Sequence, residues 1–480
     1  MAKVKTRRNV GLGLLGSGVV GEAIQDIIFQ DLRGQVGDDL RLELRKIYTR
    51  RPKNKKWFAK HRSLFTTNAR EVIDDPRVEI VIEALGFQDA AELATFKNYI
   101  IRALRKGKSV VTSDKAVLAR FGREIWSAAQ QSGQRLRFEA CVGGGIPIIR
   151  SLSESFAVEE PESVFGIVNG TCNYILSQME RSAKPYAEAL KEAQQKGYAE
   201  TNPAADVSGG DAEAKLLLLA AVAFGAQVAP GTIWRKGIED LHAVDFRYAS
   251  GTGGSTIKQL AVARRNGHAL ELFVSPVLIP RDHLLAAIDG ATNAICFKGK
   301  KSGGSLHRDC DYVLVGPGAG GGPTAVAVLG DVCELAREQQ RPTAGLPSMI
   351  RPGALKIQPQ AEIQGSFYVR FIVKDRAGIV GDIGQTFGRL GVNISEIWQL
   401  KHSDEECESL VRSYNLKAKA SDILPFVITL ERAALGQLRK ALDSIRKRDY
   451  ILNDPLWFPV WGAIAQNVGK KRAFTSTKNC

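Results

Sequence analysis

A glycine-rich turn near the N-terminus constrains the fold of this chain more than any other feature. In NVGLGLLGSGVVGEAIQDII, residues 10–15 read as a short buried strand, and from Gly18 onward the apolar positions follow helical spacing. In such a strand-turn-helix unit the first glycine permits a tight turn, the second lets the backbone approach a pyrophosphate, and the third packs helix against strand. The helix N-terminus would offer its free N–H groups to the anion. The predicted nucleotide contacts of this turn are Gly16, Gly18, Val19, Val20 and Gly21.

Strand-like and helix-like segments alternate through the rest of the first 142 residues. LRKIYT, VEIVIEALG, SVVTSDK and RLRFEACVG are apolar runs, and helices are expected around 89–106 and 116–132. This alternation predicts a parallel sheet covered by helices, which is an α/β domain of Rossmann type. We expect residues 1–142 to form this domain and residues 311–336 to return to it and complete it.

The remaining chain divides into further units. Residues 143–310 carry helices and β-rich segments such as LELFVSPVLI and are expected to form an α+β domain, whose role as substrate and dimerisation domain is implied by the family resemblance that the motifs below carry. Proline and turn formers then predict a linker over 337–364. Residues 365–450 read as β-α-β followed by β-α, a small α+β module of ordinary domain size. A disordered basic tail is expected over 462–480.

Composition excludes several classes of protein. The longest apolar run, 216–226, has 11 residues, whereas a membrane span needs about 18. No secretory signal is recognisable, and the seven cysteines lack metal-ligand spacing, so we expect reduced thiols in a cytoplasmic protein. Residues 1–9 and 467–480 each carry four lysines and arginines without an acid, which is about half of the net charge of +15. We therefore expect neither membrane nor nucleic acid as a partner.

A basic stretch follows the second predicted strand. Residues 45–62 contain nine lysines and arginines and no carboxylate, where a ribose-binding acid would otherwise stand. This favours NADP, with Arg50 near its 2′-phosphate, while NAD stays possible. The alternative is a basic surface loop, because Arg50 follows Gly16 by 34 residues rather than the usual ~20. The insertion DLRGQVGDD accounts for the extra length.

Two lysines stand where ammonium groups could do chemistry. In DVSGGDAEAKLLLL, Asp211 and Lys215 are four residues apart and would share one face of a helix, ahead of four leucines. Such a lysine either reaches out to water or is held in a cleft by carboxylates, where it could pass a proton. Lys115 follows a buried strand and begins a helix, at the end of a parallel sheet where ligands bind.

Further carboxylates lie in turns. Glu200, in GYAETNP, lies in a turn before the predicted helix that carries Asp211 and Lys215. Glu139 stands before the glycine-rich loop CVGGGIP, whose carbonyl oxygens together with one carboxylate would suit a hard monovalent cation. A glycine-rich turn with a purely structural role explains the same motif about as well.

Taken together, these motifs resemble those of homoserine dehydrogenases. The resemblance covers about residues 8–335 and is most specific over residues 197–216. The C-terminal module is similar to an ACT domain, a ferredoxin-like regulatory unit that binds amino acids. The motifs that carry the resemblance are GLLGSGVVG, IEALG, VVTSDKAVLA, FEACVGGGIPII, GIVNGTCNYIL, GYAETNPAADVSGGDAEAKL, LIPRDHLLAAIDGATNAI and GPGAGGGPTA.

The resemblance implies an activity and roles for residues. It implies NAD(P)H-dependent interconversion of L-aspartate 4-semialdehyde and L-homoserine, with Lys215 and Lys115 as catalytic lysines and Asp211 beside them. Glu200, Asp206, Asp211 and Lys215 would contact the substrate, and Lys115 and Gly320 the cofactor. A sodium or potassium ion is implied at Glu139 and the carbonyls of Val142, Gly144 and Ile146. A homodimer or homotetramer inhibited by threonine is expected.

The sequence departs from the family pattern at three places. Phe87 stands where glycine is usual, Asn202 replaces a common aspartate, and DRAG at 375–378 replaces D-x-P-G in the C-terminal module. The last departure affects the loop expected to hold an effector. Two other readings stay open: a different amino-acid oxidoreductase on the same scaffold, and a non-catalytic amino-acid sensor.

Overall fold

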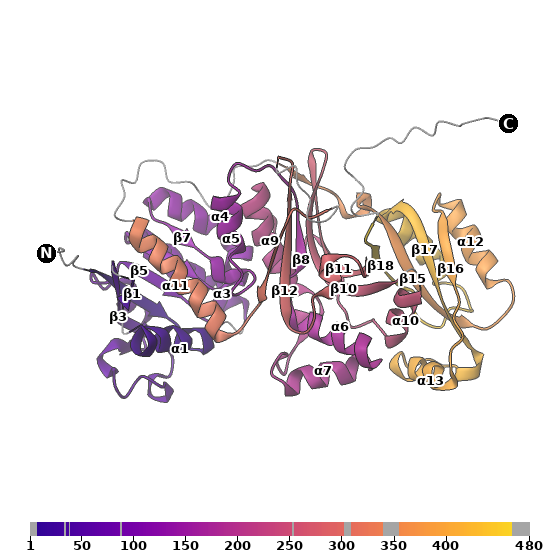
Figure 1. Cartoon of the computed structure of the whole chain (residues 1–480), viewed down its shortest axis with the longest axis horizontal. Coiled ribbons are helices and arrows are strands. Elements are labelled where there is room, and N and C mark those ends of the chain that lie inside the picture. Colours follow the sequence, from indigo (N-terminus) through magenta and orange to yellow (C-terminus); the bar gives the residue numbers. More distant parts are fainter. Residues whose placement is uncertain are drawn as a thin grey trace.

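Three units follow one another along an elongated molecule (Figure 1). The nucleotide-binding unit lies at the N-terminal end, the α+β unit lies in the middle, and the C-terminal unit lies at the opposite end. Phe87, the centre of the predicted linker and the predicted tail beyond 462 lie outside the described residues. The computed structural model describes residues 7–32, 35–37, 39–86, 89–251, 254–301, 309–338 and 355–462.

The first unit is built on a parallel sheet with the strand order β4-β3-β1-β5-β6-β7. The short strand β2 adds to β3 in the antiparallel direction. In chain order the parallel strands run 3-2-1-4-5-6, the doubly wound arrangement, whose ligand crevice opens between the first and fourth strands. That crevice lies here between β1 and β5. The strands are β1 (Arg8–Leu15), β2 (Gln35–Val36), β3 (Leu40–Tyr48), β4 (Phe65–Thr66), β5 (Ile80–Glu83), β6 (Ser109–Thr112) and β7 (Leu136–Arg137).

Helices from two distant parts of the chain cover this sheet. Helix α11, far along the chain, packs against α1 (Figure 1). Residues 311–336 are predicted to return to this unit; the helix packs here, but the strand β13 (Tyr312–Pro317) pairs with β12 (Thr292–Gly299) of the middle unit, so the prediction is wrong for the strand. The helices are α1 (Val19–Asp26), α2 (Ala69–Ile73), α3 (Ala90–Arg105), α4 (Lys115–Ser132) and α11 (Gly321–Glu338).

The middle unit is a mixed sheet whose strand β10 contacts the helices α6, α9 and α10. Its principal strands are ordered β13-β12-β8-β10-β11, and the short strands β9 and β14 also pair with β11. The strands are β8 (Pro161–Ile167), β9 (Trp234–Arg235), β10 (Ser255–Asn266), β11 (Ala269–Pro280), β12 (Thr292–Gly299), β13 (Tyr312–Pro317) and β14 (Lys356–Ile357). The helices are α5 (Ile148–Arg150), α6 (Gly170–Ser182), α7 (Tyr186–Gln195), α8 (Ala204–Val207), α9 (Gly210–Phe224) and α10 (Ala243–Gly251).

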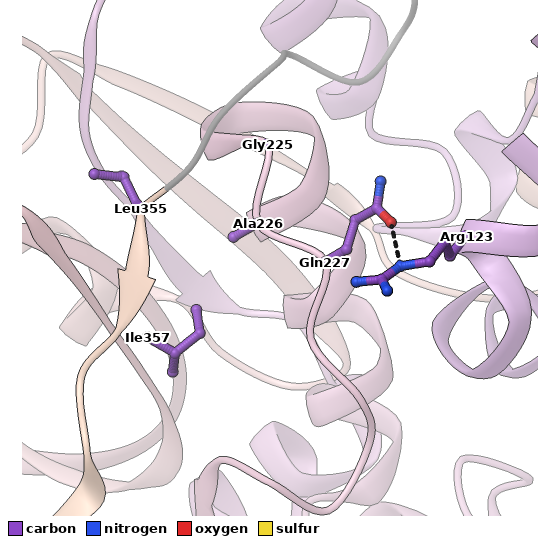
Figure 2. A pocket seen from close by; sticks show the side chains of 6 residues that line it. All are labelled: Arg123, Gly225, Ala226, Gln227, Leu355 and Ile357. Carbon is purple, nitrogen blue, oxygen red and sulfur yellow. Dashed lines mark hydrogen bonds between the residues drawn. The ribbon is translucent and has the colours of Figure 1, made fainter. Parts of the chain in front are cut away.

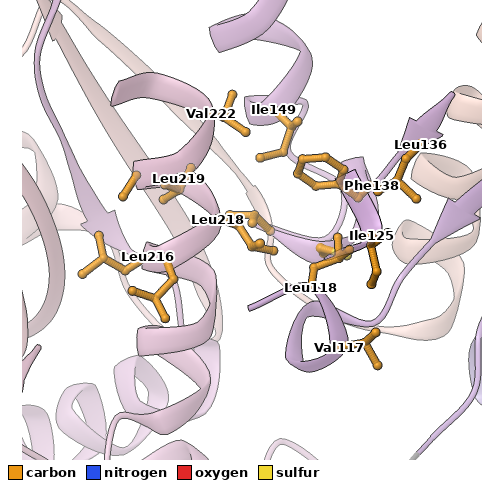
Figure 3. Packing of buried hydrophobic residues seen from close by; sticks show 14 of the residues in the cluster. Val117, Leu118, Ile125, Leu136, Phe138, Ile149, Leu216, Leu218, Leu219 and Val222 are labelled. Carbon is orange, nitrogen blue, oxygen red and sulfur yellow. The ribbon is translucent and has the colours of Figure 1, made fainter. Parts of the chain in front are cut away.

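The leucines of α9 form the core that joins the first two units. Leu216, Leu218 and Leu219 are at most 1% exposed and belong to one buried cluster with Leu118 and Ile125 of α4. Figure 3 shows Leu218 turned toward Leu118 and Ile125 across the junction, whereas Leu216 lies on the other side of α9. From Leu216 onward the helix is apolar all round because it is buried all round, as such a composition predicts.

The C-terminal unit continues the same sheet. Its strands are antiparallel in the order β18-β15-β17-β16, and β18 also pairs in parallel with β11 of the middle unit. The predicted module end at 450 is wrong, because the fourth strand lies beyond it. The predicted linker is also wrong where residues 356–357 form β14. The elements are β15 (Gln364–Lys374), α12 (Ile379–Arg389), β16 (Ile394–Trp398), α13 (Asp404–Ser413), β17 (Ile423–Ala434), α14 (Leu435–Ile445) and β18 (Leu456–Val460).

A buried ion pair fixes the C-terminal unit to the middle unit. The guanidinium of Arg370 on β15 lies 2.5 Å from a carboxylate oxygen of Asp245 on α10, and the two side chains are 1% and 0% exposed. Tyr368 donates to the other oxygen of Asp245 at 2.7 Å, and Arg370 also donates to the Tyr414 hydroxyl at 2.6 Å. Both charges thus have several partners, as burial requires.

In the described part of the chain, no helix is both long and apolar enough to cross a membrane. The six cysteines there are buried and form no disulfide.

We predict that Arg370→Met lowers the free energy of unfolding by about 3–5 kcal/mol, because it leaves the Asp245 carboxylate buried without its cation. The measurement is guanidinium unfolding followed by circular dichroism. Arg412→Met is the control: its pair with Glu408 is 67% and 58% exposed and should contribute less than about 1 kcal/mol. Equal losses in both variants would contradict a fixed junction.

Candidate active site

Lys215 is held inside the protein by two partners. It lies on the second turn of α9, where its ammonium is 2.7 Å from Asp211 and donates to the backbone carbonyl of Val168 at 2.7 Å. The residue is only 7% exposed. The pair of Asp211 and Lys215 is therefore buried and not solvent-exposed, and a catalytic role for Lys215 stays a prediction.

The same carboxylate reaches across to the nucleotide unit. Asp211 lies 3.2 Å from the ammonium of Lys115, the first residue of α4. Burial by itself raises the pKa of Asp211, but the two ammonium groups outweigh it and hold that pKa well below its ordinary value. In return, the charge of Asp211 raises the pKa of Lys115 against the effect of burial. Both ions are therefore charged at neutral pH, and the pair connects the two units.

Asn169 completes this cluster, although the sequence did not single it out. It follows β8, and its side-chain amide donates to Asp206 and to Asp211, at 2.8 Å each. Its carbonyl oxygen accepts the N–H of Cys172 and caps α6. Burial, followed by the charge of Asp211, raises the pKa of Asp206. The motif GIVNGT contained the residue, but only the fold reveals that it faces two aspartates.

Glu200 is not brought into contact with these groups. It lies exposed in the turn between α7 and α8, and among the described residues its carboxylate makes no ion pair. The turn itself is anchored, because the Thr171 hydroxyl on α6 donates to the carbonyl of Tyr198 at 2.6 Å. Asn202 accepts the N–H of Ala204 and stabilises the start of α8, a role that an aspartate could also fill.

The three glycines of the first turn take the positions that a nucleotide-binding turn needs. Gly16 has a φ of +110°, and a Cβ there would lie 2.2 Å from the carbonyl oxygen of Ala84. A Cβ at Gly21 would lie 2.3 Å from the oxygen of Gly16. At Gly18 a Cβ would meet nothing within 4 Å, so this position opens onto free space at the start of α1. The residues present thus fit a dinucleotide pyrophosphate.

A second helix begins beside this turn. Gly320 has a φ of +112° and immediately precedes α11. A Cβ at Gly321 would lie 2.9 Å from Val19, a residue that is itself 77% exposed at the start of α1. Two helix N-termini therefore lie together, and both favour an anion.

The basic stretch after β3 is partly neutralised. Arg50 pairs with Glu92 of α3 at 2.7 Å, and Lys55 pairs with Glu22 of α1 at 3.2 Å. The side chain of Arg50 is 58% exposed, and Arg51 beside it is exposed too. A 2′-phosphate would compete with Glu92 for Arg50.

Glu139 performs a structural task. Its two carboxylate oxygens accept the N–H groups of Ile149 and Arg150 at 2.8 Å each. Burial and then the charge of Asp331 raise its pKa to about 7. Of the predicted cation ligands, the Ile146 carbonyl already accepts the N–H of Ile148. In the part of the chain that is described, no three His, Cys, Asp or Glu side chains are grouped to hold a metal.

A surface hollow lies far from these groups. It is lined by Arg123 of α4, Gly225, Ala226 and Gln227 after α9, and Leu355 and Ile357 near β14 (Figure 2). Because α9 begins with Asp211 and Lys215 and ends before Gly225, the hollow lies at the opposite end of this helix from the lysine cluster. It plays no part in the chemistry considered below.

A glycine turn fitted to a dinucleotide, beside two lysines that share one carboxylate, defines an NAD(P)-dependent oxidoreductase. Residues 11–139 match the family described as "Homoserine dehydrogenase, NAD binding domain", and residues 147–333 match "Homoserine dehydrogenase". The chain belongs to the homoserine dehydrogenase family.

Relatives from several bacteria agree. The homoserine dehydrogenase of Synechocystis is 35% identical over 417 residues, which cover 85% of this chain and 93% of the relative. That of Mycobacterium tuberculosis strain H37Rv is 37% identical over 404 residues, covering 82% and 88%. The crystal structure of a homoserine dehydrogenase from Thiobacillus denitrificans aligns with a TM-score of 0.81 at 30% identity, covering 95% of this chain and 98% of that one.

The protein is therefore an enzyme that acts on the CH–OH group of homoserine with NAD(P). The two alternative readings, another amino-acid oxidoreductase and a non-catalytic sensor, give way to this finding.

We predict that alanine at two glycines of the turn affects two different properties, cofactor binding at Gly18 and stability at Gly21. Gly18→Ala should fold normally but raise the Kd for NADPH at least about tenfold, because its methyl group enters the space meant for the pyrophosphate. Gly21→Ala should lower stability by about 1–3 kcal/mol, because its methyl group meets the Gly16 carbonyl. Thermal unfolding and titration of NADPH fluorescence measure both. Normal NADPH binding by a folded Gly18→Ala would contradict this site.

Proposed function

We propose that this enzyme reduces L-aspartate 4-semialdehyde to L-homoserine by proton transfer from Lys215, within the pathway to threonine, methionine and isoleucine. The observation that supports this proposal is the buried ammonium of Lys215, held between Asp211 and a backbone carbonyl. Charge develops on an aldehyde oxygen during reduction, and a positioned ammonium both stabilises that oxygen and protonates it. In the oxidative direction, the neutral amine accepts the hydroxyl proton. The bound nicotinamide cofactor supplies or accepts the hydride.

The neighbouring residues orient the reactants. Lys115 belongs to the nucleotide unit but touches Asp211, so it would lie between cofactor and substrate and fix their relative position. Asp206 and Glu200 are the acids available for the substrate ammonium, and Asn169 holds Asp206 in place. Glu200 would reach the substrate only from its exposed turn.

For the cofactor, we propose a preference for NADP. The support is the cluster of cations after β3, in which Arg51 is exposed and Arg50 could exchange Glu92 for a phosphate. The cofactor would be held by Gly16, Gly18, Val19, Val20, Gly21, Arg50, Lys115 and Gly320. Titrating NADH beside NADPH in the Gly18 experiment also measures this preference.

For a cation, we propose a sodium or potassium site at Glu139 and the carbonyls of Val142, Gly144 and Ile146. The Val142 and Gly144 carbonyls make no backbone hydrogen bond among the described residues, and each carboxylate oxygen of Glu139 accepts one N–H and keeps a further lone pair for a cation. No catalytic step depends on this ion.

We further propose a cytoplasmic homodimer or homotetramer whose C-terminal unit is an ACT domain that binds threonine. Its support is the βαββαβ order of strands and helices, apart from the additional helix α13. The turn at 375–378 leads into α12, and its Arg376 pairs with Asp449 at 2.9 Å. An effector at this turn would contact Asp375. It would either displace the ion pair between Arg376 and Asp449 or bind beside it. Buried free cysteines support a reducing compartment.

We predict that Lys215→Ala lowers kcat for semialdehyde reduction by about 10²–10⁴, the usual contribution of a general acid, while the Kd for NADPH stays unchanged. The absorbance of reduced cofactor measures the rate. The matched control is Lys300→Ala, whose pair with Glu160 is exposed and should not affect turnover. Loss of cofactor binding together with kcat would indicate misfolding, and normal turnover would exclude Lys215 as the acid.

We predict that threonine inhibits the enzyme and that Asp375→Ala raises the half-inhibitory concentration at least about tenfold, as the loss of one charged hydrogen bond would. Deleting the C-terminal unit is a poor test, because the deletion would remove the strand β18 that pairs with β11 and would leave Asp245 without its partner Arg370. Glu405→Ala on α13 is the control and should keep wild-type sensitivity. Absence of threonine inhibition in the wild type would exclude threonine as the effector.

A further inference from the structure

A buried carboxyl group that the mechanism does not use lies under the nucleotide turn. Glu83 is the last residue of β5 and is 0% exposed. It pairs in register with Leu15 of β1, so it lies at the crevice between the first and fourth parallel strands. One of its oxygens accepts the N–H of Leu85 at 2.9 Å, in the turn that contacts Gly16 through Ala84.

The other oxygen of Glu83 leads to Lys115. It accepts a hydrogen bond from the hydroxyl of Thr112 on β6, and that hydroxyl accepts the N–H of Asp114 at 3.0 Å. Asp114 precedes Lys115 and caps α4, with one carboxylate oxygen accepting the N–H groups of Ala116 and Val117. One hydrogen-bonded connection thus runs from the turn beside Gly16 to the start of the helix that carries Lys115.

Among the described residues, no cation forms an ion pair with Glu83. The groups that face it are Asp114 before α4, the Thr112 hydroxyl on β6 and the thiol of Cys141; Cys141 in turn faces Lys115 and Asp331. The second oxygen of Asp114 is buried without a hydrogen-bond partner among the described residues, so a second negative charge beside it would be costly. Burial, and then the charge of Asp114, raises the pKa of Glu83 to about 8. Such close carboxyl groups hold one proton between them.

We propose that Glu83 is a positioning residue of the catalytic centre: as an uncharged carboxylic acid it connects the cofactor turn to the turn that carries Lys115. Ionisation of Glu83 places a second negative charge beside Asp114, pushes the turn at 112–115 apart and draws the ammonium of Lys115 away from Asp211. This inference rests on the proposed role of Lys115 and adds a pH-dependent group to it.

The test compares wild type with Glu83→Gln, which keeps the size and polarity of the acid but cannot ionise. Above about pH 8 the kcat of the wild type for semialdehyde reduction should fall, by up to about tenfold per pH unit. Glu83→Gln should keep wild-type kcat at pH 7 and lack this fall. Superimposable pH profiles, or a tenfold loss at pH 7 in Glu83→Gln, would overturn the proposal.

Two readouts do not require activity, so they separate this inference from the role of Lys215. The folded state binds the Glu83 proton more tightly than the unfolded state does, so wild-type stability is lost as pH rises from about 4.5 through about 8. The difference between the Tm of Glu83→Gln and the Tm of wild type should therefore shift in favour of the variant as the pH rises from 5 to 9. An infrared band of a protonated carboxyl at pH 7 should disappear in the variant. An unchanged Tm difference or an unchanged band would refute an uncharged Glu83.

Variants at Thr112 keep the proposal testable should Glu83→Gln not fold. Thr112→Val removes the hydroxyl but keeps the shape, and it should lower kcat roughly tenfold to a hundredfold through misplacement of Lys115. Thr112→Ser restores the hydroxyl and should restore kcat. Wild-type turnover in Thr112→Val would overturn the connection.

Discussion

The arrangement of the site depends on one carboxylate that serves two ammonium groups. Asp211 contacts Lys215 one helical turn along α9 and Lys115 at the start of α4, at 2.7 and 3.2 Å. The two lysines come from different units, so the contact of Asp211 with both fixes the distance between the units at the catalytic centre. Because like charges would otherwise repel each other, the buried ammonium of Lys215 and the partly exposed ammonium of Lys115 can both lie beside Asp211 only because they share this anion. Asn169 then keeps that anion in place from the side.

The apolar run after Lys215 gives this cluster its low-dielectric surroundings. Leucines of α9 pack against α4 and exclude water from the junction, which strengthens every charge interaction at its edge. The same helix therefore supplies both the charged groups Asp211 and Lys215 and the apolar surface next to them. This explains why a chain would place an ammonium directly before a segment that has to be buried.

Local patterns in the sequence were sufficient for much of this structure. Strand, glycine turn and helix at residues 8–26 follow from periodicity, and the pairing of Asp211 with Lys215 follows from a spacing of four on a helix. The contact of Lys115 with Asp211 could not be derived in this way, because it spans 96 positions and depends on how two units pack. Asn169 and Glu83 were likewise invisible as site residues, since only tertiary structure reveals their neighbours. The end of the C-terminal unit was misjudged because β18 is short and pairs with two distant strands.

The position of β18 has a mechanical consequence. Because this strand is hydrogen-bonded to β11 on one side and to β15 on the other, the C-terminal unit is part of a continuous sheet and is not a separate domain on a hinge. Any force on its outer strands has to travel as twist or shear through the shared ladder, toward the strands that lead to Val168 and Asn169. A signal received at that far end would reach the lysines as a small change of sheet curvature rather than as the swing of a lid.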